Sequence, residues 1–240
     1  MLVRIPAADR YHAAPAPWLS SYFLFSFADY FDRDNQHFGP LRVFNDDAVA
    51  PQNGFPQHPH SEMEIVTLVL EGEVSHEDTL GNRTVITAGE VQRMTSGTGL
   101  AHSEMNRQDK PLRLYQLWFI PSQKGLAPSY EQKDLGFTTG NKNELIPLVT
   151  GQRVLDDVVY MKSNSTIYWA NLDNDKKLVF KTFPIRLTFI YVTQGGLTIN
   201  GTTLGLNDQA RLSGEDVVEI AATHDAQFIL IDLPGSEANY

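Results

Sequence analysis

Residues 54–60 read GFPQHPH and residues 100–106 read LAHSEMN, and the stretch that runs between them decides the fold. On a β-strand, residues i and i+2 point to the same side. His58 and His60 therefore send two imidazoles to one face, and His102 and Glu104 send an imidazole and a carboxylate. Pro59 has no N–H and disfavours the helical region at His58, so the first pair is biased toward extended backbone. We predict that the four side chains meet at one point.

The segment between the two pairs alternates strand and turn signals. Ile65–Leu70 and Thr84–Ile86 are typical of strands, while Gly81-Asn82 and Ala88-Gly89-Glu90 are typical of turns. We expect a β-meander here, which folds back on itself and brings distant ligands into contact inside a small barrel. Gly, Pro and β-branched residues interrupt every candidate helix, so the fold class is predicted to be all-β.

Composition limits the classes of function. The 240 residues suit one large all-β domain or two of ordinary size. Acidic residues number 29 against 19 basic ones, a formal net charge of -10. Lys and Arg form no run, which argues against direct contact with nucleic acid. There is no cysteine, so disulfides are excluded and any metal must be held by nitrogen and oxygen.

The N-terminal residues lack a charged segment followed by a sustained apolar run. No later stretch approaches the roughly 20 apolar residues that a membrane span requires. We expect a soluble, cytoplasmic protein with no membrane contact.

Several strands and turns are expected around the histidines. Alternation from Phe23 through Phe25 to Phe27 predicts a half-buried strand, and Leu41–Phe44 predicts another. Asn45-Asp46-Asp47 is most simply a turn. Leu112–Ile120 reads as a long strand that Arg113 and Gln116 interrupt.

The second half of the chain repeats the layout of the first. Tyr191–Thr198 shares with Leu68–Val74 an apolar strand, a glycine turn and a second strand. Loop compositions at 122–128 and 136–144 place a domain connection between the halves. The second half of the chain carries a single histidine, His224, and so lacks an equivalent cluster of ligands. We therefore predict a duplicated barrel in which one half holds no metal.

Lone histidines are more often surface or hydrogen-bonded core residues than ligands. That interpretation is adopted for four of them, His12, His37, His76 and His224.

The motifs together resemble a known family. Gly54-x3-His58-x-His60-x3-Glu64-x7-Gly72 and the segment from Gly89 to Asn106 look like the two cupin motifs. Specific runs resemble the pirin family: Leu41–Asp47, His58-Pro-His60, Leu70-Glu-Gly72, His76-Glu-Asp78, Met94–Gly99 and His102-Ser-Glu104. The resemblance covers residues 20 to 135 well and is vaguer beyond.

The resemblance implies a bicupin, two tandem β-barrels. We expect residues 1–135 to form the barrel with the metal site and residues 136–240 to form a cupin-like barrel without one. It also implies an iron site and, as in several bacterial relatives, quercetin 2,3-dioxygenase activity.

The ligands carried over motif by motif are His58, His60, His102 and Glu104. Most cupins take the carboxylate from the first motif, where this chain has Glu64. Glu64 lies four residues after His60 and would face the same way in an unbroken strand, which makes it the rival candidate.

Three imidazoles and one carboxylate suit Fe(II), Mn, Ni, Cu or Zn, and ligand type alone does not choose among them. The resemblance favours iron. Four adjacent ligands leave one or two positions open, as a catalytic metal requires. A closed structural site is disfavoured, since a structural zinc site is expected to use cysteine.

The implied reaction uses a flavonol and O2. The 3-hydroxyl loses a proton, O2 adds across the central ring, and the ring opens with loss of carbon monoxide. A carboxylate must accept the proton: Glu104 itself, or Glu64 or Glu62 from outside the ligand set. Candidates for the wall of the aromatic pocket, none assigned by spacing, are Met63, Met94, Phe25, Phe27 and Trp118.

Two other functions use the same ligands. An iron-binding redox sensor or transcriptional co-regulator, as eukaryotic pirin is described, would bind a protein partner and turn nothing over. A small-molecule isomerase on a cupin scaffold is the third alternative, because a fold does not fix a function.

Overall fold

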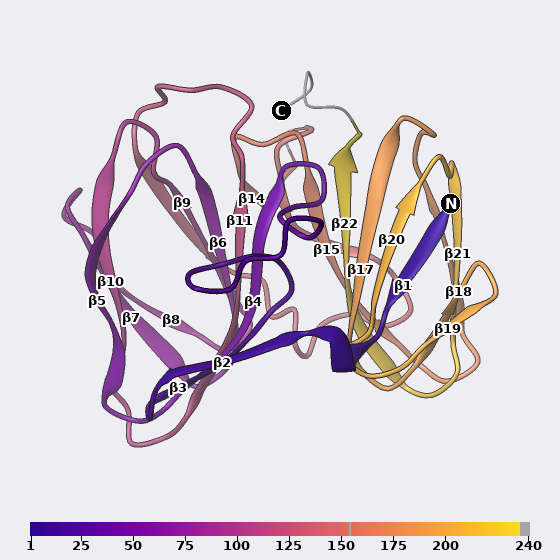
Figure 1. The fold of residues 1–240 in the computed structure, drawn as a ribbon, viewed down its shortest axis with the longest axis horizontal. Helices are drawn as coiled ribbons and strands as arrows, with labels where there is room; N and C mark the ends of the chain where they lie inside the picture. Colours follow the sequence, from indigo (N-terminus) through magenta and orange to yellow (C-terminus); the bar gives the residue numbers. More distant parts are fainter. Residues whose placement is uncertain (154, 236–240) are drawn as a thin grey trace.

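The computed structural model describes residues 1–153 and 155–235, and it consists of two β-barrels side by side (Figure 1). The last five residues of the predicted second barrel lie outside the described ones. Among the described residues, helix is limited to the 3-10 turn η1 (Ala7–Asp9). No helix in this part of the chain is long and apolar enough to cross a membrane. The all-β expectation is confirmed.

Each barrel pairs a seven-stranded sheet with a four-stranded one. In the first barrel the large sheet runs, in spatial order, β12 (Ser129–Asp134), β9 (Glu90–Thr95), β6 (Glu64–Glu71), β11 (Leu112–Phe119), β4 (Leu41–Val49), β3 (Leu19–Phe23) and β2 (Tyr11–Ala16). Its small sheet is β5 (Asn53–His60), β10 (Leu100–Asn106), β7 (Glu73–Asp78) and β8 (Arg83–Thr87).

The second barrel repeats this arrangement. Its large sheet is β1 (Leu2–Ile5), β20 (Gln209–Ser213), β17 (Arg186–Gln194), β22 (Ala226–Pro234), β15 (Thr166–Leu172), β13 (Ile146–Thr150) and β14 (Val159–Tyr160). Its small sheet is β16 (Lys177–Lys181), β21 (Val217–Ala222), β18 (Leu197–Ile199) and β19 (Thr202–Leu204).

The predicted meander is wrong, because the chain changes sheets along it. β6 belongs to the large sheet and β7 to the small one, and the chain returns to the large sheet at β9. Gly72 makes the first crossing with φ of 77°. A Cβ there would lie 2.7 Å from the carbonyl oxygen of Pro111, so only glycine fits. Gly195, with φ of 70°, makes the equivalent crossing between β17 and β18, which supports the internal repeat.

The interiors of the two barrels differ in chemistry. One apolar cluster fills the second barrel, with Ile190, Leu197, Val218 and Phe228 among its members. The first barrel has two smaller clusters, one around Val69 and Leu114 and the other around Ile65 and Met94. Polar side chains from the middle of its strands, including Thr67, Gln116, His102 and Glu104, are buried as well.

A further cluster joins the barrels. Alternate residues of β6 and β11, Val66, Leu68, Tyr115, Leu117 and Phe119, point away from the first barrel's interior. They pack with residues of β13, β15, β17 and β22, such as Phe189 and Ile231, in one core. Both faces of β6 are therefore buried, which accounts for its nearly continuous apolar sequence.

The second barrel receives an edge strand from outside its own stretch of chain. β1 pairs with β20 of the second barrel, and its indigo ribbon runs beside β20 in Figure 1. β12, just before the second half, pairs with β9 of the first. The division at residue 135 stays a prediction, but residues 2–5 join the sheet of the second barrel because their backbone groups pair there.

Two local expectations around residue 40 are wrong. Asn45, Asp46 and Asp47 form no turn but lie inside β4, where all three are buried. The strand expected over Phe23–Phe27 ends at Phe23, because Phe25 leaves the sheet to pack against Phe189 between the barrels.

Candidate metal centre

Strands β5 and β10 place the three histidines. They pair antiparallel with His102 opposite His58 and Leu100 opposite His60. A register shift between His102 and Glu104 interrupts the pairing. The side chain of His102 is fully buried, whereas His58 and His60 are half-buried.

The Nε2 atoms of these histidines converge. Nε2 of His102 lies 3.0 Å from Nε2 of His60 and 3.2 Å from Nε2 of His58. One ring nitrogen from each of the three lies within 4.8 Å of the others, a spacing that fits the ligands of one metal ion. The sequence predicted that four side chains meet. The structure brings the three histidines together, whereas the donor atoms of Glu104 group with those of His76 and His102.

The hydrogen bonds and pKa values favour lone pairs, not protons, at the convergence point. Nδ1 of His58 lies 2.7 Å from the carbonyl oxygen of Pro56, which can only accept, so Nδ1 carries the proton and Nε2 of the neutral ring is free to bind a metal. Burial, together with the neighbouring His102 and His58, lowers the pKa of His60 to about 4. Burial also lowers the pKa of His102 to about 4. The donor set therefore fits a divalent transition metal.

Glu104 is buried beside the histidines and held by two donors. Its Oε1 accepts a hydrogen bond from Thr67 Oγ1 at 3.2 Å, and its Oε2 accepts one from Gln116 Nε2 at 3.0 Å. Gln116 Oε1 in turn accepts from Trp118 Nε1 at 3.0 Å. Burial alone would raise the pKa of Glu104, but His102 and the bond from Gln116 outweigh it, and the net shift is downward. The carboxylate is thus ionised and fixed in place.

His76, interpreted from the sequence as a lone surface or hydrogen-bonded core histidine, lies directly beside the site. It is fully buried, its Nε2 lies 3.1 Å from Asp78 Oδ2, and its Nδ1 lies 3.5 Å from Nδ1 of His102. His76, His102 and Glu104 form a second group with donor atoms within 4.8 Å of one another. An imidazole on the outer side of a ligand histidine orients that ligand. The His76-x-Asp78 spacing was the available signal.

Glu64 lies elsewhere. β5 ends at His60 and β6 begins at Glu64, with Glu62 at φ of 53° between them, so the unbroken strand assumed for the rival ligand does not exist. The carboxylate of Glu64 instead accepts from the backbone N–H of Lys162 at 2.9 Å. Burial raises its pKa. Glu62 accepts from the Gly125 N–H, at 3.1 Å and 3.2 Å from its two oxygens.

A cavity of about 300 Å³ opens onto the histidines. Most of its wall surface is aromatic or apolar, and polar side chains line it from both sheets of the barrel. Lining residues are Phe27, Asn45, Asp47, Phe55, Pro56, His58, His60, Glu104, Gln116 and Trp118. Trp118 packs edge-on against His60, with ring centroids 4.8 Å apart, and against Phe27 at 5.3 Å.

Two of the five predicted wall residues line this cavity, Phe27 and Trp118. Met63 and Met94 pack behind Trp118 in an apolar cluster. Phe25 lies between the barrels.

Asp47, like Asn45, lines the cavity although the sequence predicted a turn there. It is 4% exposed, and Ser21 Oγ donates a hydrogen bond to its Oδ1. Burial raises its pKa to about 7, although the hydrogen bond from Ser21 lowers it and the charges of Asp46 and Glu104 raise it. Alternation along β4 was the signal, because Asn45, Asp47 and Val49 share one face.

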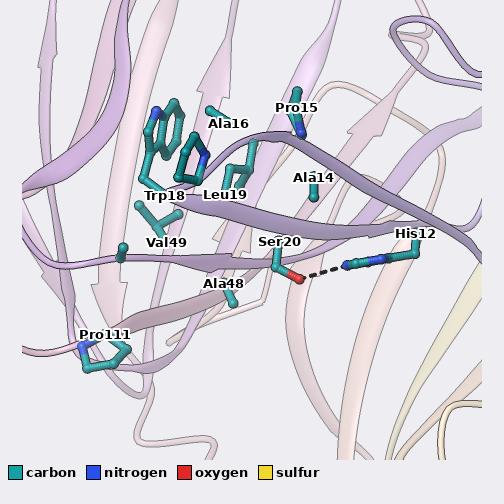
Figure 2. A pocket seen from close by; sticks show the side chains of 12 residues that line it. His12, Ala14, Pro15, Ala16, Trp18, Leu19, Ser20, Ala48, Val49 and Pro111 are labelled. Carbon is teal, nitrogen blue, oxygen red and sulfur yellow. Dashed lines mark hydrogen bonds between the residues drawn. The ribbon is translucent and has the colours of Figure 1, made fainter.

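The remaining histidines serve local contacts. Nε2 of His12 lies 2.9 Å from Ser20 Oγ, Nδ1 of His37 lies 3.0 Å from the Gly39 carbonyl oxygen, and Nδ1 of His224 lies 3.3 Å from Thr223 Oγ1. Figure 2 shows His12 turned toward Ser20 beside a second groove along β2 and β3. That groove, about 610 Å³, is lined mostly by Ala, Pro, Val and Leu and has no cluster of metal-binding side chains. It is not the candidate centre.

Comparison with known proteins follows the same division of the chain. The family described as Pirin matches residues 7–119. The quercetinase C-terminal cupin domain matches residues 148–233. The two matches fall on the barrel with the histidines and on the apolar barrel, respectively.

Relatives match over nearly the whole length. A quercetin 2,3-dioxygenase from Escherichia coli O157:H7 is 38% identical over 230 residues, 95% of this chain and 96% of that protein. A pirin-like protein from Caulobacter vibrioides is 35% identical over 225 residues, 93% of this chain and 96% of that protein. The crystal structure of the bacterial pirin YhhW from Escherichia coli in complex with nickel(II) superposes with a TM-score of 0.91 at 36% identity, covering 98% of this chain and 100% of that one.

Proposed function

The chain belongs to the pirin family, with the bicupin fold of two cupin-type domains, and we propose that it is a metal-dependent dioxygenase. Its substrates would be O2 and a flavonol such as quercetin, whose central ring it opens with release of carbon monoxide. The observation that carries the proposal is the convergence of three Nε2 lone pairs at the floor of an aromatic-walled cavity.

The metal would be held by His58, His60, His102 and Glu104. The tautomer at His58 and the ionised, doubly hydrogen-bonded carboxylate of Glu104 support this assignment. We favour iron, while a related structure holds nickel. When bound, the metal supplies a redox-active, Lewis-acidic centre for the reaction of the flavonol anion with O2.

The cavity supports a flat aromatic substrate. Trp118 and Phe27 stand edge to face, and Phe55 contributes a third ring to the wall. Such walls bind a planar ring by burial of its faces and exclude water from the reacting atoms. The polar side chains of the lining, His58, His60 and Asp47 among them, would orient the hydroxyl-bearing edge.

The competing function is a redox sensor or co-regulator that uses the same ligands and a protein partner. A sensor needs no substrate cavity next to its metal, whereas this cavity ends at His58 and His60. The open space beside the histidines is therefore the observation that favours an enzyme.

The experiment that decides follows quercetin absorbance and carbon monoxide together. Protein loaded with Fe(II), and separately with Mn, Ni and Cu, is mixed with quercetin in air beside the His60→Ala variant. Quercetin oxidises slowly by itself, so colour loss alone is insufficient. The enzyme requires carbon monoxide in proportion to quercetin lost, with neither above background in the variant. Equal rates with and without His60 for every metal would remove the dioxygenase claim.

A further inference from the structure

Asp47 is the only acidic residue besides Glu104 among those that line the cavity in the described chain. It sits on β4 opposite Leu114 of β11 and Ser21 of β3, with its side chain on the cavity face. The titratable groups around the same cavity are His58 and His60 on β5 and Glu104 on β10. Asp47 thus faces the metal centre from the opposite sheet.

The hydrogen bonding of Asp47 leaves it able to take a proton. The adjacent Asp46 points to the other side of β4 and pairs with Arg113 at 3.1 Å and with Arg10 at 3.6 Å. Within the described residues, Asp47 has no such ion pair, and its one hydrogen bond is from Ser21. A buried carboxylate without a cation holds a proton more readily, in line with its raised pKa.

Glu104 is less suited to that role. Both of its oxygens already accept hydrogen bonds, from Thr67 and from Gln116, and its pKa is lowered. A carboxylate that also binds a metal would have to leave one of these partners before it accepted a proton. Asp47 needs no such rearrangement.

We propose that Asp47 is the catalytic base that accepts the proton of the flavonol hydroxyl, a role that rests on the dioxygenase function proposed above. The O–H bond of the substrate breaks, its electron pair stays on the flavonol oxygen, and the proton moves to a carboxylate oxygen of Asp47. The flavonol anion then takes up one O2 and loses one carbon monoxide. The ring-opened ester leaves as its carboxylate, and Asp47 releases the proton to water, which restores its own carboxylate.

The test compares Asp47→Asn with wild type in the metal-loaded full chain. Asparagine keeps the shape and can still pair with Ser21, but it cannot accept a proton. Turnover is expected to fall about 100-fold, as for loss of a general base, with metal content unchanged. Asp208→Asn is the matched control, because Asp208 is an equally buried carboxylate that binds Arg4 and the Ala7 N–H in the second barrel. Its turnover should equal that of wild type.

A second readout is independent of turnover. Under nitrogen, the absorbance of bound quercetin reports whether its hydroxyl is ionised. The apparent pKa of bound quercetin is expected to be lower by at least about one unit in Asp47→Asn than in wild type, because the carboxylate of Asp47 beside the hydroxyl disfavours the flavonol anion. If Asp47→Asn does not fold, the pair Asp47→Glu and Asp47→Gln gives the same comparison, and only the carboxylate member should retain turnover.

The outcomes separate the two claims. Wild type without carbon monoxide release overturns the dioxygenase and the role of Asp47 with it. Wild-type turnover that Asp47→Asn retains, together with an unchanged ionisation of bound quercetin, overturns the role of Asp47 alone. Loss of metal from Asp47→Asn would also overturn it, since Asp47 would then support the centre and not the proton transfer.

Discussion

His58 and His102 face each other across the β5–β10 pair with their Nε2 atoms 3.2 Å apart. The ring proton of His58 is on Nδ1, which donates a hydrogen bond to the carbonyl oxygen of Pro56. The lone pair of His58 Nε2 therefore points toward His102 and His60, and a cation between the three rings satisfies all of them at once. The predictions below begin from this relationship.

Metal binding should require each of the three histidines. Replacement of His58, His60 or His102 by Ala is expected to lower metal affinity at least about tenfold. Loss of a residue that only hydrogen-bonds to a ligand already lowers affinity by about that factor. Elemental analysis after anaerobic loading with Fe(II) and gel filtration measures it. Wild type should hold one equivalent, and His224→Ala should hold the same amount. Two tightly held equivalents would mean that the second barrel also binds metal.

The two rival carboxylates should behave differently. Glu104→Gln is expected to lower both metal retention and turnover, since its carboxylate lies within 4.8 Å of ring nitrogens of His102 and His76 and hydrogen bonds fix it. Glu64→Gln should spare the metal, because that carboxylate accepts from the Lys162 N–H. Metal titration of the two variants side by side measures this. Retention by Glu104→Gln with loss from Glu64→Gln would assign the ligand to Glu64.

The stability of the metal-free protein should carry a signature of Asp47. The pKa of Asp47 is about 7 in the folded chain, against an ordinary value of 3.8 that applies to the unfolded chain. Between these pH values the folded chain holds a proton that the unfolded chain releases, so stability falls as pH rises from about 4 to 7. Asp47→Asn lacks this loss. It should be more stable than wild type above pH 7, by up to about 4 kcal/mol for a shift of about three units.

Urea unfolding of both proteins at pH 4, 6 and 8 measures this difference. The advantage of Asp47→Asn should be absent near pH 4 and largest at pH 8. An advantage that did not change with pH would show that Asp47 titrates alike in the folded and unfolded chains.

The aromatic wall should set affinity for the substrate. Trp118→Leu removes the ring that packs against His60 and Phe27. We expect the loss of aromatic contact to cost about 2 kcal/mol of binding free energy. The dissociation constant for quercetin, measured under nitrogen, should then be about 30-fold larger. Trp118→Phe should keep most of the affinity. Phe183→Ala, a change at an exposed ring far from the cavity lining, is the control and should bind as wild type does. Equal affinity in Trp118→Leu would place the substrate elsewhere.

The sequence was sufficient for the parts that depend on local spacing. His58, Pro59 and His60 alternate on an extended segment, and this pattern alone predicts a shared face. The repeat of strand, glycine and strand at Gly72 and Gly195 likewise predicted two equivalent barrels, since only glycine adopts the required φ.

The parts that depend on contacts across the fold were not predictable in this way. Asn45-Asp46-Asp47 has the composition of a turn, and only pairing of β4 with both β3 and β11 forces it to be a strand. The break between His60 and Glu64 follows from the passage of the chain from one sheet to the other, which periodicity does not reveal. Gln116 was noticed as an interruption of an apolar strand, but its partner Glu104 lies on another sheet.

The pairing of β1 with the second barrel has a consequence for the behaviour of fragments. A gene fragment that ended at residue 135 would keep β1 without β20 and would expose the apolar surface of Val66, Leu68 and Leu117. The complementary fragment would leave β20 as a bare edge, a template for aggregation. The two halves should thus melt in a single cooperative transition. By covering the apolar outer face of the first barrel, the second barrel would be retained for the stability of its partner, whatever chemistry it has of its own.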